Sequence, residues 1–185
     1  ILILALPAIF ARSIEGGAVV RAIPGPHCSS RSVADRMNSW AQGEGAPGMG
    51  YIIYGDGEAK GPVAGALGKE KCDEIKNRLR LQDGDAAFFS CSNLKDAADL
   101  AGKARVKIGI DQEISETDGY KFCWIIDYPM YEIDEKTKKI KFSHNPFSMP
   151  QGDIKSINYD EPLKIKAFQY DIVCNGIELS SGAIT

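Results

Sequence analysis

The chain lacks closely spaced cysteine pairs. Its five cysteines are scattered through 185 residues, as Cys28, Cys72, Cys91, Cys123 and Cys174. An odd, dispersed set argues against a disulfide framework and against a zinc site, since both bring cysteines together in pairs. We interpret all five as small hydrophobic side chains, buried in a protein of a reducing compartment, and assign no metal to them.

A hydrophobic run long enough to cross a membrane is also missing. Residues 1–6 are apolar, but Pro7 interrupts them, and the run is too short to span a bilayer. No basic residue precedes it, so it does not have the form of a signal peptide. We expect a buried strand within residues 1–10 and no membrane association. Because no methionine opens the chain, we also expect the polypeptide to begin further upstream.

The sequence has no excess of positive charge and no familiar nucleotide or nucleophile motif. Its net charge is −3, so contact with nucleic acid would need a local basic patch. Basic residues do gather between Lys69 and Arg80, but acids are mixed with them, which is more typical of a solvated helix face. A phosphate-binding glycine loop and a serine or cysteine nucleophile site are both absent.

Strand-like and helix-like segments alternate in the first part of the chain. Strands are expected at residues 18–23, 49–54 and 86–91. Helices are expected after a cap at Ser30 or Ser32, at residues 62–67 and 69–81, and from Asn93 to about Lys107. This alternation predicts a small α/β or α+β domain. In the last helix the side chains expected to face inward are Leu94, Ala97, Ala98, Ala101 and Ala104.

The second part of the chain reads as antiparallel β structure. Residues 111–119 are polar and rich in turn formers, which indicates a domain boundary. Beyond it we predict strands at residues 121–127, 139–143 and 164–179, with Asn175-Gly176 interrupting the last, and no helix. The fold class of the whole chain is therefore predicted to be α+β.

Asn175-Gly176 lies between two apolar runs and is a strong signal for a β-hairpin. With these two residues as the loop, Cys174 should pair with Ile177, Val173 with Glu178, and Asp171 with Ser180. The face expected to form core carries Phe168, Tyr170, Ile172, Cys174, Ile177 and Leu179. The opposite, polar face carries Gln169, Asp171, Val173, Glu178 and Ser180.

Two acids are diagonal neighbours on that polar face. The Cβ atoms of Asp171 and Glu178 should lie about 7–8 Å apart, close enough for both carboxylates to reach a shared magnesium ion. The alternative is an ordinary solvated face, on which acids are common. His144 has the same two interpretations, because Pro146 puts it on an extended loop where it is either a ligand-binding residue or a surface histidine.

Three segments, in order, resemble bacterial aspartyl-tRNA synthetases of class II: residues 122–132, 144–147 and 170–179. Upstream, residues 19–24, 61–64 and 82–89 are similar to the GAD domain inserted in the same enzymes. The resemblance implies a GAD insertion domain at 11–113 and part of a class II catalytic domain at 114–185, and the uncertain N-terminal strand at 1–10 precedes them.

The resemblance also implies roles for particular residues. Glu178 matches a glutamate of the ATP site, and Asp171 matches an aspartate that holds magnesium with it. His144 matches a histidine that binds the substrate L-aspartate, and Asn145 stands where many members have a second histidine. Thr185 occupies the position of an arginine that clamps the substrate carboxylate, a role that threonine cannot take. We therefore favour a truncated or misassigned terminus there.

The activity implied is that of an aspartate–tRNA ligase. Such an enzyme uses ATP and Mg²⁺, with neither zinc nor haem, to form aspartyl-adenylate, and then transfers aspartate to the 3′ end of tRNA(Asp). Whether tRNA(Asn) is a second substrate stays open. The resemblance implies a cytoplasmic homodimer. We expect this chain alone to be inactive, because the anticodon-binding barrel and the arginine-bearing motifs of the family are missing from it.

Two other functions remain as alternatives. Some subunits of tRNA-dependent amidotransferases carry a related GAD domain, but residues 121–179 match the synthetases. A free-standing binding module is the second alternative, and the acidic hairpin argues against it.

Overall fold

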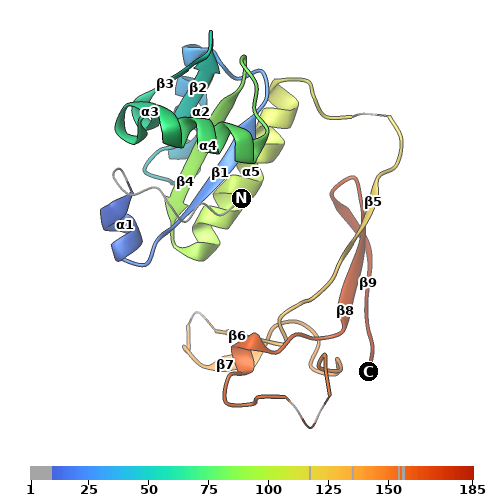
Figure 1. Ribbon diagram of the computed structural model, residues 1–185. Helices are drawn as coiled ribbons and strands as arrows, with labels where there is room; N and C mark the ends of the chain where they lie inside the picture. The colour runs from blue at the N-terminus through green and yellow to red at the C-terminus, as the bar shows by residue number, and fades with distance from the viewer. Residues whose placement is uncertain (1–9, 117, 135, 154, 156) are drawn as a thin grey trace. The chain divides into compact units, whose positions relative to one another are not determined.

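The computed structural model describes residues 10–116, 118–134, 136–153, 155 and 157–185. Figure 1 shows the elements in chain order. The chain divides into two compact units, residues 1–115 and 116–185, and each is described by itself. The strand expected within residues 1–10 lies outside the described residues except for Phe10, whose ring packs 6.3 Å from that of Phe89.

The first unit is built on a four-stranded sheet in the order β1-β4-β2-β3. The strands are β1 (Val19–Gly25), β2 (Gly50–Gly55), β3 (Glu58–Lys60) and β4 (Ala86–Ser92). The segments β1 and β2 run in the same direction, but β4 lies between them and is antiparallel to both. The described unit is therefore α+β, and the α/β alternative suggested by the alternation of elements is wrong.

Helices cover both faces of this sheet (Figure 1). They are α1 (Ala11–Glu15), α2 (Arg31–Gly43), α3 (Pro62–Leu67), α4 (Lys69–Leu79) and α5 (Leu94–Asp111). Of the two caps predicted for α2, the structure has Ser30 and not Ser32, and the cap predicted at Asn93 is confirmed. The side chain of Ser30 accepts a hydrogen bond from the amide of Val33 at the start of α2, and Asn93 accepts one from Asp96 at the start of α5.

The central strand β4 is buried on both sides. Its consecutive residues Phe88 and Phe89 are 0% and 1% exposed and point to opposite faces. Phe88 belongs to the cluster with α2 and α5, which includes Met37 and Ile108. Phe89 belongs to the cluster with α3 and α4, which includes Ile75. One strand thus supplies the middle of both apolar layers.

The inward face predicted for α5 is partly wrong. Ala97 and Ala104 are buried as expected, and Ile108 joins them, but Leu94 is 61% exposed and Ala98 is also exposed. Successive helix positions are about 100° apart, so Ala98 falls beside the buried stripe. Leu94 is the first residue of α5, so it lies at the end of the row of buried side chains that begins with Ala97.

All five cysteines are free, as predicted. Burial is not uniform, because Cys123 is exposed and Cys91 is half-buried, which corrects the expectation that all five are buried. Burial raises the pKa of Cys28 to about 11, with further contributions from nearby acids. This thiol is therefore protonated at neutral pH and packs as a small apolar group.

The second unit contains two antiparallel sheets. One has the order β5-β8-β9 and consists of β5 (Phe122–Ile125), β8 (Gln169–Cys174) and β9 (Ile177–Ala183). The other is a hairpin of β6 (Tyr131–Ile133) and β7 (Ile140–Phe142). A short 3-10 helix, η2 (Pro162–Lys164), occupies the beginning of the strand predicted at 164–179. Among the described residues, no helix is long and apolar enough to cross a membrane.

The predicted faces of the β8–β9 hairpin need correction. Ile177 and Leu179, expected in a core, are 68% and 57% exposed. Gln169, expected on a wet face, is buried at 7% exposure. The apolar cluster of this unit forms instead around Met130 and Ile165. Alternation of side chains thus placed Asp171 and Glu178 on one face, but it did not show which face is covered, and it placed Ser180 on the wrong face, because Ser180 pairs with Ile172.

We predict that Phe88→Ala lowers the free energy of unfolding of the first unit by about 3–5 kcal/mol, because it leaves a cavity in a closely packed layer. Leu94→Ala, at an exposed site, should change it by less than about 0.5 kcal/mol. Urea denaturation followed by far-ultraviolet circular dichroism measures both, since every described α-helix belongs to this unit. Equal losses in the two variants would contradict the assignment of the core.

Candidate functional site

The site begins with the turn between β8 and β9. Asn175 and Gly176 both have positive φ, at 49° and 82°, which is the conformation of a two-residue turn that matches the twist of a hairpin. The Asn175 side chain also ties the turn to the segment before β5. Its Oδ1 accepts a hydrogen bond from the amide of Lys121 at 2.8 Å, and its Nδ2 donates to the carbonyl of Gly119 at 3.1 Å.

The hairpin register is the predicted one near the turn and differs beyond it. Cys174 pairs with Ile177 and Val173 with Glu178, as predicted. A β-bulge then shifts the register, so that Asp171 pairs with Ser181 and not with Ser180. The bulge adds one residue to β9, and the register on its far side could not be found by counting from the turn. Asp171 and Glu178 nevertheless stay on one face.

A cavity of about 270 Å³ opens on this face. It brings together three of the predicted site residues, Asp171, Glu178 and His144, and Asn145 beside them. Thr185 is exposed and does not line it. The residues that sequence reasoning did not assign to the site are Tyr128, Gln169, Ser181, Gly182 and Ala183.

Tyr128 contacts two of these residues. Its hydroxyl donates a hydrogen bond to Oδ2 of Asp171, and its ring meets the ring of His144 edge-on, with centroids 5.1 Å apart. The hydrogen bond to Asp171 raises the pKa of Tyr128 to about 12, with smaller contributions from burial and from the negative charges of Asp171 and Glu178. Tyr128 is thus a protonated donor facing two carboxylates.

The backbone around Tyr128 is held by its neighbours. Asp127 has a positive φ of 63°, and its carboxylate accepts hydrogen bonds from Lys166 at 2.9 Å and Gln151 at 3.1 Å. The hydrogen bonds from Lys166 and Gln151 lower the pKa of Asp127. The carbonyl of Tyr128 accepts a hydrogen bond from the amide of Ala167 at 2.8 Å. These contacts fix where the tyrosine side chain leaves the backbone.

The loop that carries His144 is hydrogen-bonded to the buried side-chain amide of Gln169. Gln169 donates to the carbonyl of Asn145 at 3.1 Å and to the hydroxyl of Ser148 at 2.5 Å. Ser148 itself donates to the same carbonyl at 2.8 Å. The buried Gln169 side chain thus gives hydrogen-bond partners to the Asn145 carbonyl and the Ser148 hydroxyl. An apolar residue at this position would remove these hydrogen bonds.

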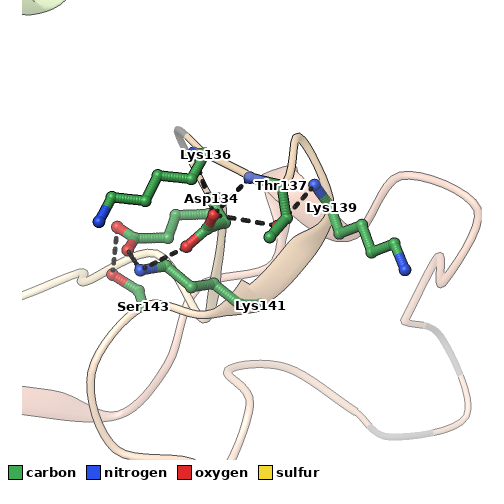
Figure 2. Close-up of polar contacts among 7 residues, drawn as sticks. Asp134, Lys136, Thr137, Lys139, Lys141 and Ser143 are labelled. Atoms are coloured by element: carbon green, nitrogen blue, oxygen red, sulfur yellow. Dashed lines mark hydrogen bonds and ion pairs between the residues drawn. The ribbon is translucent and has the colours of Figure 1, made fainter.

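The chain enters that loop from the β6–β7 hairpin, whose tip is shown in Figure 2. Oδ1 of Asp134 accepts hydrogen bonds from the amides of Lys136 and Thr137, at 3.1 and 2.7 Å, and from the Thr137 hydroxyl at 3.0 Å. Lys141 pairs with Asp134 at 3.5 Å. At the other end of the hairpin, the amide of Ser143 donates to the carbonyl of Met130 at 3.0 Å. His144 follows directly.

The donors around the cavity suit a particular kind of ligand. Two carboxylates and an imidazole line the cavity. They are not arranged as three ligands of one metal ion, and no other such group occurs among the described residues. Magnesium is commonly held by one or two carboxylates while phosphate groups supply further ligands. The residues present therefore fit a cation that arrives with a phosphorylated ligand better than a cation bound by protein alone.

Comparison with known proteins gives concordant results. A family profile described as tRNA synthetases class II (D, K and N) matches residues 34–185. Two proteins named aspartate–tRNA(Asp/Asn) ligase, from Acidiphilium cryptum and Paramagnetospirillum magneticum, are each 51% identical to this chain over 178 residues. A third of the same name, from Phenylobacterium zucineum, is 51% identical over 179 residues.

These relatives are much longer than this chain. The alignments cover 95% of the chain, but only 30% of the Acidiphilium and Phenylobacterium proteins and 20% of the Paramagnetospirillum protein. The chain thus spans less than a third of the length of these relatives.

We predict that the hydrogen bonds accepted by Asp134 in this turn are lost when its carboxylate is protonated at low pH. Hydrogen bonds from Thr137, and then from Lys136 and Lys141, lower the pKa of Asp134. A carboxylate with a lowered pKa stabilises the fold above its ordinary pKa, about 4, and this contribution is lost as the pH falls through the lowered value. The amide NMR signals of Lys136 and Thr137 should therefore move only below about pH 4. In Asp134→Asn this acid transition should be absent, and its persistence would refute the assignment.

Proposed function

Because the chain belongs to the class II tRNA synthetases of the D, K and N group, we propose that it is part of an aspartate–tRNA ligase. In this proposal it contributes carboxylates to the binding of ATP with Mg²⁺, and a histidine to the binding of aspartate. The observation that carries the proposal is the grouping of Asp171, Glu178 and His144 around one cavity. The names of the relatives, all aspartate–tRNA(Asp/Asn) ligases, supply the substrates.

Asp171 and Glu178 would hold the magnesium ion that accompanies ATP. Both belong to the rigid β8–β9 ribbon, so their separation is set by the sheet and not by a mobile loop. When bound, magnesium neutralises charge on the phosphate oxygens during displacement at the α-phosphorus. The role of the two side chains is to fix the ion and the nucleotide in one orientation. Proton transfer by these residues is not needed.

His144 would bind the carboxylate of the substrate aspartate. Its imidazole lines the same cavity as the two acids, and an imidazole N–H is a suitable donor to a carboxylate. The aspartate would then lie beside the nucleotide, as its attack on the α-phosphorus requires. Thr185 brings no positive charge and is exposed, so the carboxylate clamp of the family is not assigned to it.

The remaining parts of the proposal concern the whole enzyme. We propose that the first unit is the inserted GAD domain and the second unit part of the catalytic domain. We further propose a cytoplasmic homodimer that charges tRNA(Asp) and, by the relatives' names, tRNA(Asn). A tRNA-dependent amidotransferase subunit is not favoured, because the 51% identical relatives are named as ligases.

We predict that Glu178→Gln weakens the binding of metal–nucleotide to this chain by roughly 10-fold or more, because it removes one of two anionic ligands. In NMR spectra, Mn²⁺ added with ATP should broaden the amide signals of Asp171 and Glu178, and the variant should lose most of this broadening. Glu161→Gln is the matched control, since Glu161 is an exposed glutamate of the same unit that does not line the cavity. If the Asp171 and Glu178 amide signals of the unsubstituted chain do not broaden, the proposed function is wrong.

A second prediction concerns catalysis. The 185-residue chain alone should show ATP–pyrophosphate exchange with aspartate no faster than background, because two carboxylates and a histidine leave the phosphate charges without a cationic partner from the protein. The measurement is exchange of labelled pyrophosphate into ATP with and without aspartate. Aspartate-dependent exchange well above background would show that the cavity is sufficient by itself.

A further inference from the structure

Tyr128 contacts both proposed halves of the cavity. Its hydroxyl donates to Oδ2 of Asp171, on the side of the proposed magnesium ligands. Its ring packs edge-on against His144, at an interplanar angle of 84°, on the side of the proposed aspartate ligand. The two contacts use different parts of the side chain, so they can be removed separately.

The hydrogen bond leaves part of Asp171 free. Oδ2 is occupied by the tyrosine hydroxyl, whereas Oδ1 has no hydrogen-bond partner among the described residues. A carboxylate has several lone-pair sites and can bind a cation while it accepts a hydrogen bond. A donor fixed on one oxygen restricts rotation of the carboxylate, and so decides in which direction the other oxygen points.

The Tyr128 hydroxyl does not depend on Asp171 for a hydrogen-bond partner. Tyr128 is only half-buried and lines an open cavity, so water could satisfy its hydroxyl if Asp171 were absent. The position of the tyrosine is set independently, by the hydrogen bond from Ala167 to its carbonyl and by the contacts of Asp127. The backbone of Tyr128 is thus held by contacts that do not involve Asp171, and the ring of Tyr128 also packs against His144.

We propose that Tyr128 is a positioning residue that orients Asp171 through its hydroxyl and His144 through its ring. This inference rests on the proposed function, because the value of orienting these two side chains depends on their binding metal–nucleotide and aspartate. Tyr128 itself contacts neither ligand in this proposal. Its effect on binding is transmitted through its two neighbours.

The test uses Tyr128→Phe and Tyr128→Leu in the 185-residue chain. The phenylalanine keeps the ring against His144 and removes only the hydroxyl. The apparent dissociation constant for Mn²⁺ in the presence of ATP, from the broadening of the Asp171 and Glu178 amides, should rise roughly 10-fold in this variant. The shift of the His144 ring signals on addition of aspartate should stay as in the unsubstituted chain.

Tyr128→Leu removes the ring as well, so both the Mn²⁺ response and the aspartate response should weaken. A uniform structural role would instead make the two variants alike in both responses, and that result overturns the inference. The inference also fails alone if Glu178→Gln loses Mn²⁺ binding while Tyr128→Phe binds as tightly as the unsubstituted chain. If the unsubstituted chain gives no response at Asp171 and Glu178, the proposed function fails and the inference with it.

Discussion

The candidate site depends on one backbone constraint, the left-handed conformation of Asn175 and Gly176. Most side chains tolerate positive φ poorly, whereas asparagine and glycine adopt it readily. The two residues therefore make β8 and β9 pair directly beside the turn, with Cys174 opposite Ile177 and Val173 opposite Glu178. From that register follows the shared face of Asp171 and Glu178, and from that face the cavity. The hydrogen bonds of Asn175 to Lys121 and Gly119 then fix the ribbon beside β5.

Local signals were sufficient for much of the fold. The helix cap at Asn93, the buried strand at Phe88 and the hairpin at Asn175 each depend on a few neighbouring residues, and each was predicted correctly. The cap at Ser30 was one of two that the sequence allowed. The same locality explains the errors. The bulge in β9, the burial of Gln169 and the exposure of Ile177 are set by what packs against the hairpin, which side-chain alternation does not reveal.

Tyr128 shows where sequence reasoning alone stopped. It lies 43 residues before Asp171, and nothing in the spacing of the two residues suggests that they meet. Tyr128 lies within residues 122–132, which resemble the synthetases, but the resemblance implies no role for it. Only the arrangement of Asp127, Lys166 and the His144 loop shows that this side chain lies between the two groups of proposed ligands.

The position of β4 has a consequence for how the first unit opens. Phe88 and Phe89, neighbours on this strand, pack against separate helix layers. Detaching either layer therefore exposes a large aromatic side chain of β4 to water, although β4 still packs against the other layer. Partial opening is therefore costly, and the unit should come apart as one cooperative block. Backbone amides of β4 would be the last in this unit to exchange with solvent deuterium, because their exposure requires both layers to separate at once.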